Sequence, residues 1–392
     1  MKITGIVCEY NPIHNGHLYH IEQTRKNGAT HIIAVMSGNF VQRGETAVMD
    51  KFTRSALALK GGADLVIEIP AVYCLSSAEF YARGAVSIMN SLGCVDEISF
   101  GSECGDIDML RTAAEAVRSV DRELVTKKMK GGMTYPAALC DVLHEKYSDI
   151  SAVAASPNNI LAIEYLNALK LLESGIRPFT VCRYGAGHDS EYAEGSFASA
   201  SYIRKNVDEA DRFIPEYVMS EYRRCLIDGK LSDMSRLERV ILYRLRMADL
   251  KELQTVPDVG QGLEYRLMQS ASEKTLDGLL ERLKTKRYTM ARLKRILLNL
   301  TIGITKDDLK ILPPYARVLA FNERGREILS LCKESRIPVS TSLSRLSASG
   351  YEAERFAFLE GRASDVYGLS LEDAGSKEDD FRASVRITEN EL

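Results

Sequence analysis

The chain has 392 residues, more than most single domains contain, so we expect two domains. Hydrophobic residues make up 45% of it and charged residues 27%, the proportions of a soluble globular protein. The formal net charge of -3 excludes a uniformly basic nucleic-acid-binding protein, although it allows a local basic patch.

The eight cysteines are scattered, and none lies in a Cys-x-x-Cys pair. A structural zinc site needs clustered ligands, and a secreted disulfide scaffold is shorter and denser in cysteine. We therefore expect reduced thiols and no metal site. No charged N-terminal stretch precedes an apolar one, and no apolar run approaches the ~20 residues of a membrane span. The sequence predicts a cytoplasmic protein with no membrane partner.

The first hundred residues alternate short apolar strands with helices. We expect strands at 3–10, 31–37, 65–69 and 97–100, with helices at 15–26, 50–60 and 77–90. This alternation predicts βαβ units and a parallel sheet that is covered on both faces. Ligands of such sheets bind at the carboxyl ends of the strands, near the point where the strand order reverses.

The rest of the chain is mainly helical. A helical stretch over 106–175 leads to a fifth strand at 178–183, and a short helix opens at Ser201. Further on, 317–321 and 338–340 flank a helical segment and predict a small strand-helix-strand unit. We therefore expect a Rossmann-like α/β domain over 1–207, followed by a mainly helical domain over 208–392 that contains this unit.

The segment EYNPIHNGH (residues 9–17) follows the first expected strand and opens the first expected helix. Asn11-Pro12 predicts a turn, because a residue before proline avoids the helical region. Gly16 leaves room for a nucleotide, and the helix N-terminus offers N–H groups to phosphates. His14 and His17 project to the same side and can donate hydrogen bonds to a phosphate that gains charge as pyrophosphate leaves.

Two alternatives stay open for these histidines. Histidines at a helix start also serve as caps or as core residues, and a metal site built from His14, His17 and His20 would lack a suitably spaced acidic or cysteine partner. We favour phosphate binding, because the HxGH pattern follows both a strand and Asn-Pro. His20 is expected to pack or to form a hydrogen bond.

HxGH in this position resembles the signature of the nucleotidyltransferase superfamily, whose members bind ATP on a Rossmann-like sheet and transfer an adenylyl group. Residues 199–204 (SASYIR) resemble its second signature, a serine-rich turn before Ile-Arg at a helix start. There Ser199 and Ser201 would cap the helix and donate to phosphate, and Arg204 would neutralise charge. Alone, such a segment is usually only a helix cap, and Ala200 departs from the superfamily form.

At finer grain the chain resembles the bacterial tRNA(Met) cytidine acetate ligases. The matching segments are EYNPxHNGHLYH, SGNFVQRGE, LVIEIP, FGSE, PNNILAIEYL, the R-x-GAG-H-D loop and RYTMARLKRILLNL. The resemblance implies an ATP site that includes one of two adjacent asparagines and the following residues: Val7, Cys8, Glu9, Tyr10, Asn11, Pro12, Ile13, His14, Asn15, Gly16, His17, Leu18, Tyr19, His20, Gly101, Asn158 or Asn159, Arg183, Tyr184, Ser201 and Arg204.

The resemblance also implies the reaction. Acetate would attack ATP, accompanied by Mg²⁺, to give acetyl-adenylate, and the acetyl group would pass to N4 of the wobble cytidine of elongator tRNA(Met), with no role for DNA. His14 and His17 would stabilise the departing pyrophosphate. The alternatives are an adenylyltransferase that makes a dinucleotide-type cofactor and a non-catalytic RNA-binding protein with a vestigial nucleotide site. The large second domain argues against the first, and the intact motif residues argue against the second.

Other polar residues lie near these motifs. Arg43, Lys51 and Arg54 are either ligands of phosphate or tRNA, or solvated surface charges. Ser37, Asn39 and Gln42 are candidates for the acetate pocket by position only. Cys8 lies within the ATP segment, but no motif pairs it with a base, so we expect a packing residue rather than a nucleophile.

Residues 284–295 (KTKRYTMARLKR) concentrate basic side chains in a chain of almost zero net charge. Arg287, Arg292 and Arg295 are therefore predicted to bind tRNA phosphates, with Tyr288 stacked on a base. The alternative is an amphipathic helix whose charged face is merely solvated.

Overall fold

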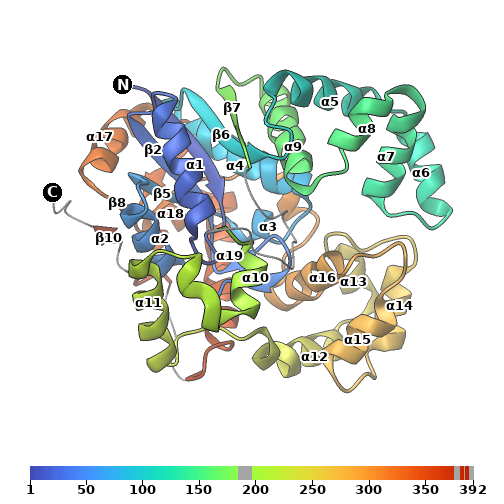
Figure 1. Ribbon diagram of the computed structural model, residues 1–392. Helices are drawn as coiled ribbons and strands as arrows, with labels where there is room; N and C mark the ends of the chain where they lie inside the picture. The colour runs from blue at the N-terminus through green and yellow to red at the C-terminus, as the bar shows by residue number, and fades with distance from the viewer. Residues whose placement is uncertain (184–196, 375–379, 384, 388–392) are drawn as a thin grey trace.

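The computed structural model describes residues 1–183, 197–374, 380–383 and 385–387, and a mainly parallel sheet runs through it (Figure 1). The strands lie in the order β10, β8, β5, β2, β1, β6, β7, and β9 also pairs with β8. Every pairing is parallel except that of β5 with β8. The strands are β1 (Ile3–Cys8), β2 (His31–Ser37), β5 (Leu65–Ile69), β6 (Glu97–Ser102), β7 (Arg177–Cys182), β8 (Ala316–Phe321), β9 (Val339–Ser340) and β10 (Arg386–Ile387).

The predicted α/β fold with a parallel sheet is confirmed. All residues of β2 and β5 are buried, as expected for strands covered on both faces. On one face pack α1 (Asn15–Lys26), α2 (Lys51–Lys60) and α11 (Glu216–Ile227). The other face is covered by α3 (Ala71–Cys74), α4 (Ala78–Leu92), α5 (Ile107–Ser119), α9 (Pro157–Leu171) and α19 (Tyr351–Gly368).

The polar loop expected after β2 contains a small antiparallel hairpin of β3 (Phe40–Val41) and β4 (Glu45–Thr46). Gly44 turns the hairpin with φ of 74°, a conformation that side-chain-bearing residues rarely adopt. A Cβ at this glycine would also lie 2.7 Å from the main-chain nitrogen of Arg295, so the hairpin packs closely on the helix that carries that residue.

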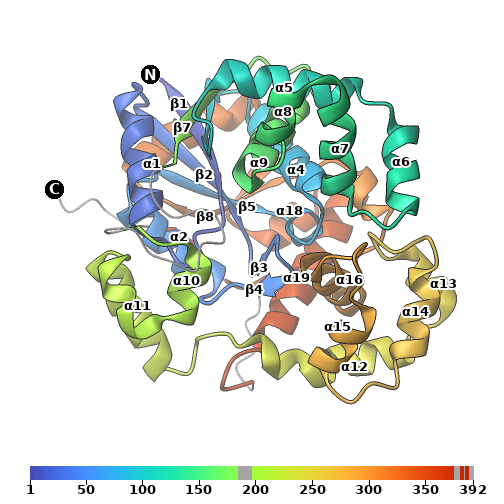
Figure 2. The ribbon, with the colours of Figure 1, turned by 45° about the vertical axis from the view of Figure 1, so that its right-hand side comes forward.

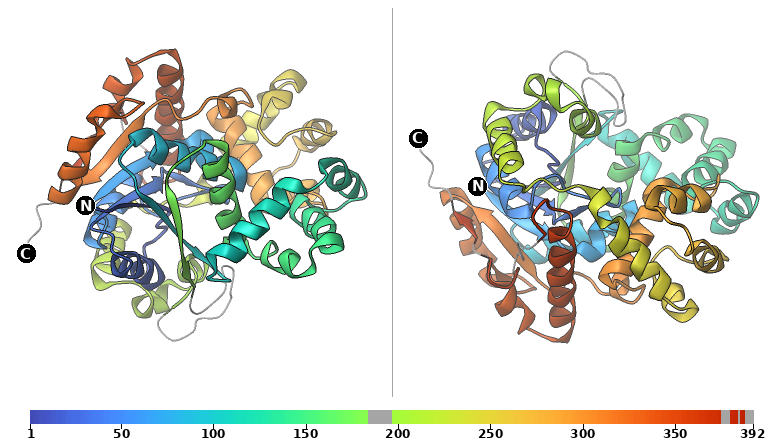
Figure 3. Two further views of the ribbon diagram at one scale, coloured as in Figure 1. Left: turned by 90° about the horizontal axis from the view of Figure 1, so that it is seen from above. Right: turned by 90° about the horizontal axis from the view of Figure 1, so that it is seen from below.

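Further helices form two groups on the side of the molecule away from the chain ends (Figures 2 and 3). One group holds α6 (Arg122–Lys130), α7 (Tyr135–Lys146) and α8 (Ser148–Val153). The other holds α12 (Glu238–Met247), α13 (Leu250–Thr255), α14 (Leu263–Ser270), α15 (Leu276–Leu283) and α16 (Met290–Ile302). Among the described residues, no helix combines the length and the apolar character that crossing a membrane requires.

The strand-helix-strand unit expected inside the second domain contributes to the main sheet instead. Strand β8 pairs antiparallel with β5, with Leu65 opposite Phe321, and α17 (Glu323–Leu331) follows it. A Cβ at Gly325 would lie 2.1 Å from the carbonyl oxygen of Asp64, so α17 approaches the start of β5 as only glycine permits. Strands β8, β9 and β10 therefore belong to the main sheet although they follow the expected domain boundary at 207/208. The small α18 (Leu343–Ser347) leads into α19.

Candidate active site

A cavity of about 210 Å³ opens at the carboxyl ends of β1, β6 and β7. Strands β1 and β6 are neighbours in the sheet, although the chain passes through β2 and β5 between them, so the strand order reverses here. Ligands of parallel α/β sheets bind at such a reversal. Residues from the first turns of α1, α9 and α10 (Ala200–Lys205) complete the wall.

The two motif histidines meet at this cavity. Their rings stack, with centroids 3.7 Å apart and planes inclined by 26°. His14 caps α1, since its Nδ1 accepts a hydrogen bond of 3.1 Å from the main-chain N–H of Gly16. Nδ1 of His17 accepts one of 3.2 Å from the main-chain N–H of His14.

These bonds define the tautomers. A neutral imidazole whose Nδ1 accepts a hydrogen bond carries its proton on Nε2, so both rings have an Nε2–H donor. Capping uses Nδ1 alone and is therefore compatible with phosphate binding through Nε2. The expected glycine also leaves room for the ring of His14, because a Cβ at Gly16 would lie 3.0 Å from Cε1 of that ring.

Arg204 joins the second motif to the first. Its guanidinium donates a hydrogen bond of 2.7 Å to the main-chain carbonyl of Asn11 and one of 3.4 Å to Oγ of Ser201. Ser199 caps α10, as its Oγ accepts from the main-chain N–H of Tyr202 at 3.0 Å. Arg204, Ser199 and Ser201 all line the cavity. The two signatures, far apart in the sequence, thus form one site.

The two adjacent asparagines differ in position. Asn158 lines the cavity, and its Oδ1 accepts a hydrogen bond of 3.2 Å from Arg183. Asn159 faces the loop after β6, where its Oδ1 accepts from the main-chain N–H of Glu103 at 2.9 Å. The carboxylate of Glu103 in turn accepts from the main-chain N–H groups of both asparagines. Asn158 is therefore the better placed of the two to contact a ligand.

Most other residues expected at the ATP site line the cavity. A Cβ at Gly101 would lie 3.2 Å from Cγ of Arg183, so this glycine makes room for the arginine. Further lining residues among those expected are Val7, Cys8, Glu9, Tyr10, Asn11, Tyr19 and His20. Four residues of the first motif are not among the described residues that line it: Pro12, Ile13, Asn15 and Leu18. Tyr184 lies outside the described residues.

An aromatic wall of the cavity was not expected from the sequence. It consists of Tyr81, Phe100, Tyr165 and Phe197, and the rings of Phe100 and Tyr165 lie 5.5 Å apart. Aromatic and apolar side chains are the usual lining of small-molecule sites. These residues come from a strand, two helices and a loop, so no local motif unites them.

Comparison with known proteins agrees with this geometry. The family model HIGH Nucleotidyl Transferase matches residues 1–381. The chain is 39% identical to the tRNA(Met) cytidine acetate ligase of Clostridium perfringens over 88% of this chain and 90% of that one. It is also 39% identical to the enzyme of the same name from Caldanaerobacter subterraneus, over 99% of this chain and 100% of that one.

Among solved structures, it resembles the crystal structure of Thermotoga maritima TmcAL without ligand, with a TM-score of 0.93, 30% identity and full coverage of both chains. The same protein bound to alpha-thio ATP gives a TM-score of 0.91. The chain belongs to the tRNA(Met) cytidine acetate ligase family.

Burial shifts the pKa values of two side chains in the first motif, Cys8 and His20. Burial raises the pKa of the Cys8 thiol far above its ordinary value, which disfavours a nucleophilic thiolate. Burial, and then Arg183, lower the pKa of His20 to about 4, so its ring is neutral. Its Nε2 lies 2.8 Å from Oγ of Ser99.

The described residues hold no group of three His, Cys, Asp or Glu side chains suited to a metal ion.

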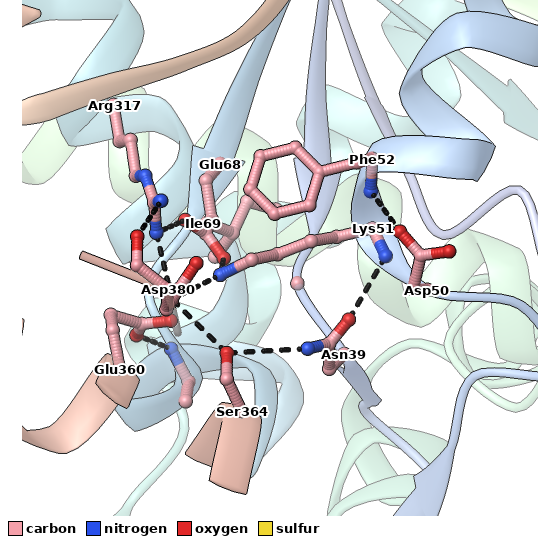
Figure 4. Close-up of polar contacts among 12 residues, drawn as sticks. Asn39, Asp50, Lys51, Phe52, Glu68, Ile69, Arg317, Glu360, Ser364 and Asp380 are labelled. Atoms are coloured by element: carbon pink, nitrogen blue, oxygen red, sulfur yellow. Dashed lines mark hydrogen bonds and ion pairs between the residues drawn. The ribbon is translucent and has the colours of Figure 1, made fainter. Parts of the chain in front are cut away.

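Lys51 and Arg54 are neither phosphate ligands nor surface charges, since each is only 1% exposed. Arg54 donates to the main-chain carbonyls of Glu9, Ser37, Gly38 and Met49 and so ties the ends of β1 and β2 together. Lys51 is the centre of a buried charge network (Figure 4). Arg43, in contrast, lines the cavity.

That network joins distant parts of the chain. Nζ of Lys51 donates to Glu68 at 2.6 Å and to Asp380 at 2.7 Å. Arg317 of β8 donates to the same two carboxylates at 3.2 and 2.8 Å. Ser364 donates to Asp380 at 3.0 Å, and Figure 4 shows these groups converging between α2, β5, β8 and α19.

Of the three residues suggested for the acetate pocket, only Gln42 lines the cavity. Oγ of Ser37 lies 3.1 Å from the hydroxyl of Tyr81, and both groups are buried. Asn39 accepts from the main-chain N–H of Lys51 at 2.9 Å and donates to Ser364 at 3.3 Å. Ser37 and Asn39 are therefore structural residues beneath the site.

The basic segment has a different arrangement from the one expected. Tyr288 is buried, and the guanidinium groups of Arg287 and Arg292 lie 5.8 and 5.1 Å from its ring centroid. Arg292 also donates to the carbonyl of Asp258 at 2.6 Å. Arg295 is 7% exposed, and it donates to the carbonyl of Gln42 at 3.1 Å and to the carboxylate of Asp258 at 3.3 Å. Arg295 therefore joins α16 to the wall of the cavity.

Proposed function

We propose that this chain is an ATP-dependent ligase that activates acetate as acetyl-adenylate and transfers the acetyl group to N4 of the wobble cytidine of elongator tRNA(Met). The observation that carries the proposal is the pair of Nε2–H donors of His14 and His17 at the strand-order reversal of the sheet. The names of the relatives support tRNA(Met), cytidine and acetate as the substrates, and tRNA as a substrate supports a cytoplasmic location.

In the first step, an oxygen of acetate attacks the α-phosphorus of ATP, and the bond to pyrophosphate breaks. Negative charge grows on the departing pyrophosphate, and donors aimed at that charge lower the barrier. His14 and His17 supply two such donors, and the guanidinium of Arg204 supplies a fixed positive charge beside them. In the second step, N4 of the cytidine attacks the acetyl carbonyl and AMP leaves.

Mg²⁺ is part of the proposal as an ion that arrives with the nucleotide. Mg²⁺ in such sites is held mainly by phosphates and water and needs few protein ligands. The described residues fit that arrangement, because they offer no three-ligand cluster of their own. Bound with ATP, the ion would neutralise phosphate charge.

The proposal is tested by acetate-dependent exchange of labelled pyrophosphate into ATP. His14→Ala and His17→Ala are expected to slow the exchange by roughly 10²-fold or more if their hydrogen bonds form in the transition state. His144→Ala is the matched control, because this histidine lies exposed on α7 and contacts Ser151. Exchange that is independent of acetate in the unaltered protein would contradict the proposed acid, and unchanged rates in both histidine variants would remove these residues from the mechanism.

A further inference from the structure

Glu9 is the only acidic side chain among the described residues that line the cavity. Around it, the lining consists of apolar, aromatic, neutral polar and basic groups, including Arg43, Arg183 and Arg204. ATP and acetate are both anions, so a carboxylate beside them weakens their binding by like-charge repulsion. Glu9 at the end of β1 is therefore better suited to a step in which it acts on a group that is not an anion.

The carboxylate of Glu9 is held in one orientation. Its Oε1 accepts a hydrogen bond of 2.8 Å from the main-chain N–H of Gln42. Gln42 is fixed in turn, because its carbonyl accepts from Arg295 at 3.1 Å and its side chain donates to the carbonyl of Ser76 at 3.2 Å. Within the described part of the chain, Oε2 makes no hydrogen bond. Oε2 is also not fully buried, because it is absent from the buried side-chain oxygens without a partner among the described residues. Oε2 is thus accessible from the cavity.

We propose that Glu9 accepts the proton that the exocyclic amine of the cytidine loses during acetyl transfer. This inference rests on the proposed function. The lone pair of N4 attacks the carbonyl carbon of the acetyl-adenylate, and a C–N bond forms. The N–H proton passes to Oε2 of Glu9, and the bond from the carbonyl carbon to the phosphate oxygen breaks, with its electron pair leaving on AMP. An amide nitrogen that kept this proton would carry a positive charge and expel the amine again.

The surroundings of Glu9 suit a proton acceptor. Burial raises the pKa of Glu9 above its ordinary value and so strengthens the carboxylate as a base. The N–H of Gln42 and the charges of Arg204, Arg43 and Arg54 act in the opposite direction and limit the rise in pKa. The other titratable groups facing it are the hydroxyls of Tyr81 and Tyr165 and the thiols of Cys8 and Cys74, whose raised pKa values leave them neutral.

The test separates the two steps. Glu9→Gln keeps an oxygen that can accept from Gln42 but cannot take a proton, so its geometry is conserved. We expect acetate-dependent pyrophosphate exchange to be retained and the transfer of labelled acetyl from preformed adenylate to tRNA to fall by about 10²–10⁴-fold. Glu327→Gln is the control, because this exposed carboxylate pairs with His31 at the amino end of β2, opposite the cavity. It is expected to change neither step.

A pH profile distinguishes a proton acceptor from a residue that only supports the Gln42 loop. In the unaltered protein, transfer is expected to slow as pH falls through the raised pKa of Glu9, whereas the Glu9→Gln variant lacks this decline. Transfer at the normal rate in the variant, or equal loss of exchange and transfer, would overturn the inference. Absence of exchange in the unaltered protein would instead contradict the proposed function, so the two failures are distinguishable.

Discussion

Nζ of Lys51 donates a hydrogen bond of 2.7 Å to Asp380, although the two lie 329 positions apart in the sequence. Lys51 is the first residue of α2, which follows the β3–β4 hairpin. Its main-chain N–H donates to the side chain of Asn39, just before that hairpin. Asp380 is therefore attached to the framework beneath the cavity. The carboxylate of Asp380 faces two buried cations, Lys51 and Arg317.

Asp380→Asn is expected to destabilise the protein strongly. The amide cannot balance the charges of Lys51 and Arg317, which would then share Glu68 in a site that water does not reach. Removing one partner of a buried ion pair typically costs about 3–5 kcal/mol. Urea denaturation measures the loss. Asp307→Asn is the control, because Asp307 is 83% exposed beside Lys310, and surface pairs contribute about 0–1 kcal/mol. Equal effects of the two changes would show that the network adds nothing to stability.

The same carboxylate makes stability depend on pH in the acid range. Burial alone would raise the pKa of Asp380, but Lys51 and Arg317 outweigh burial and hold the pKa well below its usual range. A depressed pKa contributes stability that is fully present above the unfolded value of 3.8 and is lost as pH falls through the folded value. Denaturation midpoints measured downward from pH 5 are expected to decline, and to decline less in Asp380→Asn. Parallel declines would contradict the assignment.

Glu360 is expected to respond in the opposite direction. Burial, and then the nearby Glu68, raise its pKa well above the ordinary value of 4.5, so the folded protein favours the protonated form. The unfolded chain ionises first as pH rises above 4.5, which destabilises the fold. Glu360→Gln retains an oxygen that can accept from the main-chain N–H of Ala71 and lacks this titration. The variant should gain stability relative to the unaltered protein as pH rises above 4.5. A relative loss over that range would mean that Glu360 is ionised in the fold.

The parallel sheet was predictable because each strand is a short apolar run followed by a helix, a pattern that few other folds share. Strand β8 was assigned to a separate unit because its partner, β5, lies some 250 positions earlier and the pairing of Leu65 with Phe321 leaves no local signal. The periodicity of apolar residues predicts which side chains are buried. It does not predict which other segment of the chain they pack against.

The candidate site was predictable where chemistry is local, as in His14, Gly16 and His17. Lys51 and Arg54 could not be assigned from sequence, because a buried cation differs from an exposed one only through partners that lie elsewhere in the chain. The two asparagines could not be ranked, although neighbouring residues of a helix point about 100° apart. The aromatic wall of Tyr81, Phe100, Tyr165 and Phe197 has no common motif.

The difference between Asn158 and Asn159 leads to a prediction. Asn158→Ala removes a cavity side chain that accepts from Arg183 and donates to Glu103, so the KM for ATP in the exchange reaction should rise. Asn159→Ala leaves the N–H groups of Glu103 and Cys104 without their acceptor, and it should destabilise the protein by about 1–3 kcal/mol. Kinetics and urea denaturation of both variants check the assignment. It is wrong if Asn159→Ala is the variant that mainly raises the KM.

The predicted RNA-binding residues are expected to separate into two groups. Arg287 and Arg292 are half-buried against Tyr288, close to the exposed Lys284 and Lys286, and they stay candidates for binding phosphate. Removing one phosphate-binding side chain should reduce the slope of log affinity against log salt by about 0.7–0.9. Arg287→Ala and Arg292→Ala should therefore flatten the salt dependence of tRNA binding and leave pyrophosphate exchange unchanged.

Arg295 is buried and bonded to Gln42 and Asp258, so Arg295→Ala should leave that slope unchanged and impair catalysis through the Gln42 loop. Filter binding of tRNA at several salt concentrations measures the slopes. An unaltered slope in the Arg287 and Arg292 variants would place the RNA surface elsewhere, and a flattened slope in Arg295→Ala would show that α16 opens when tRNA binds.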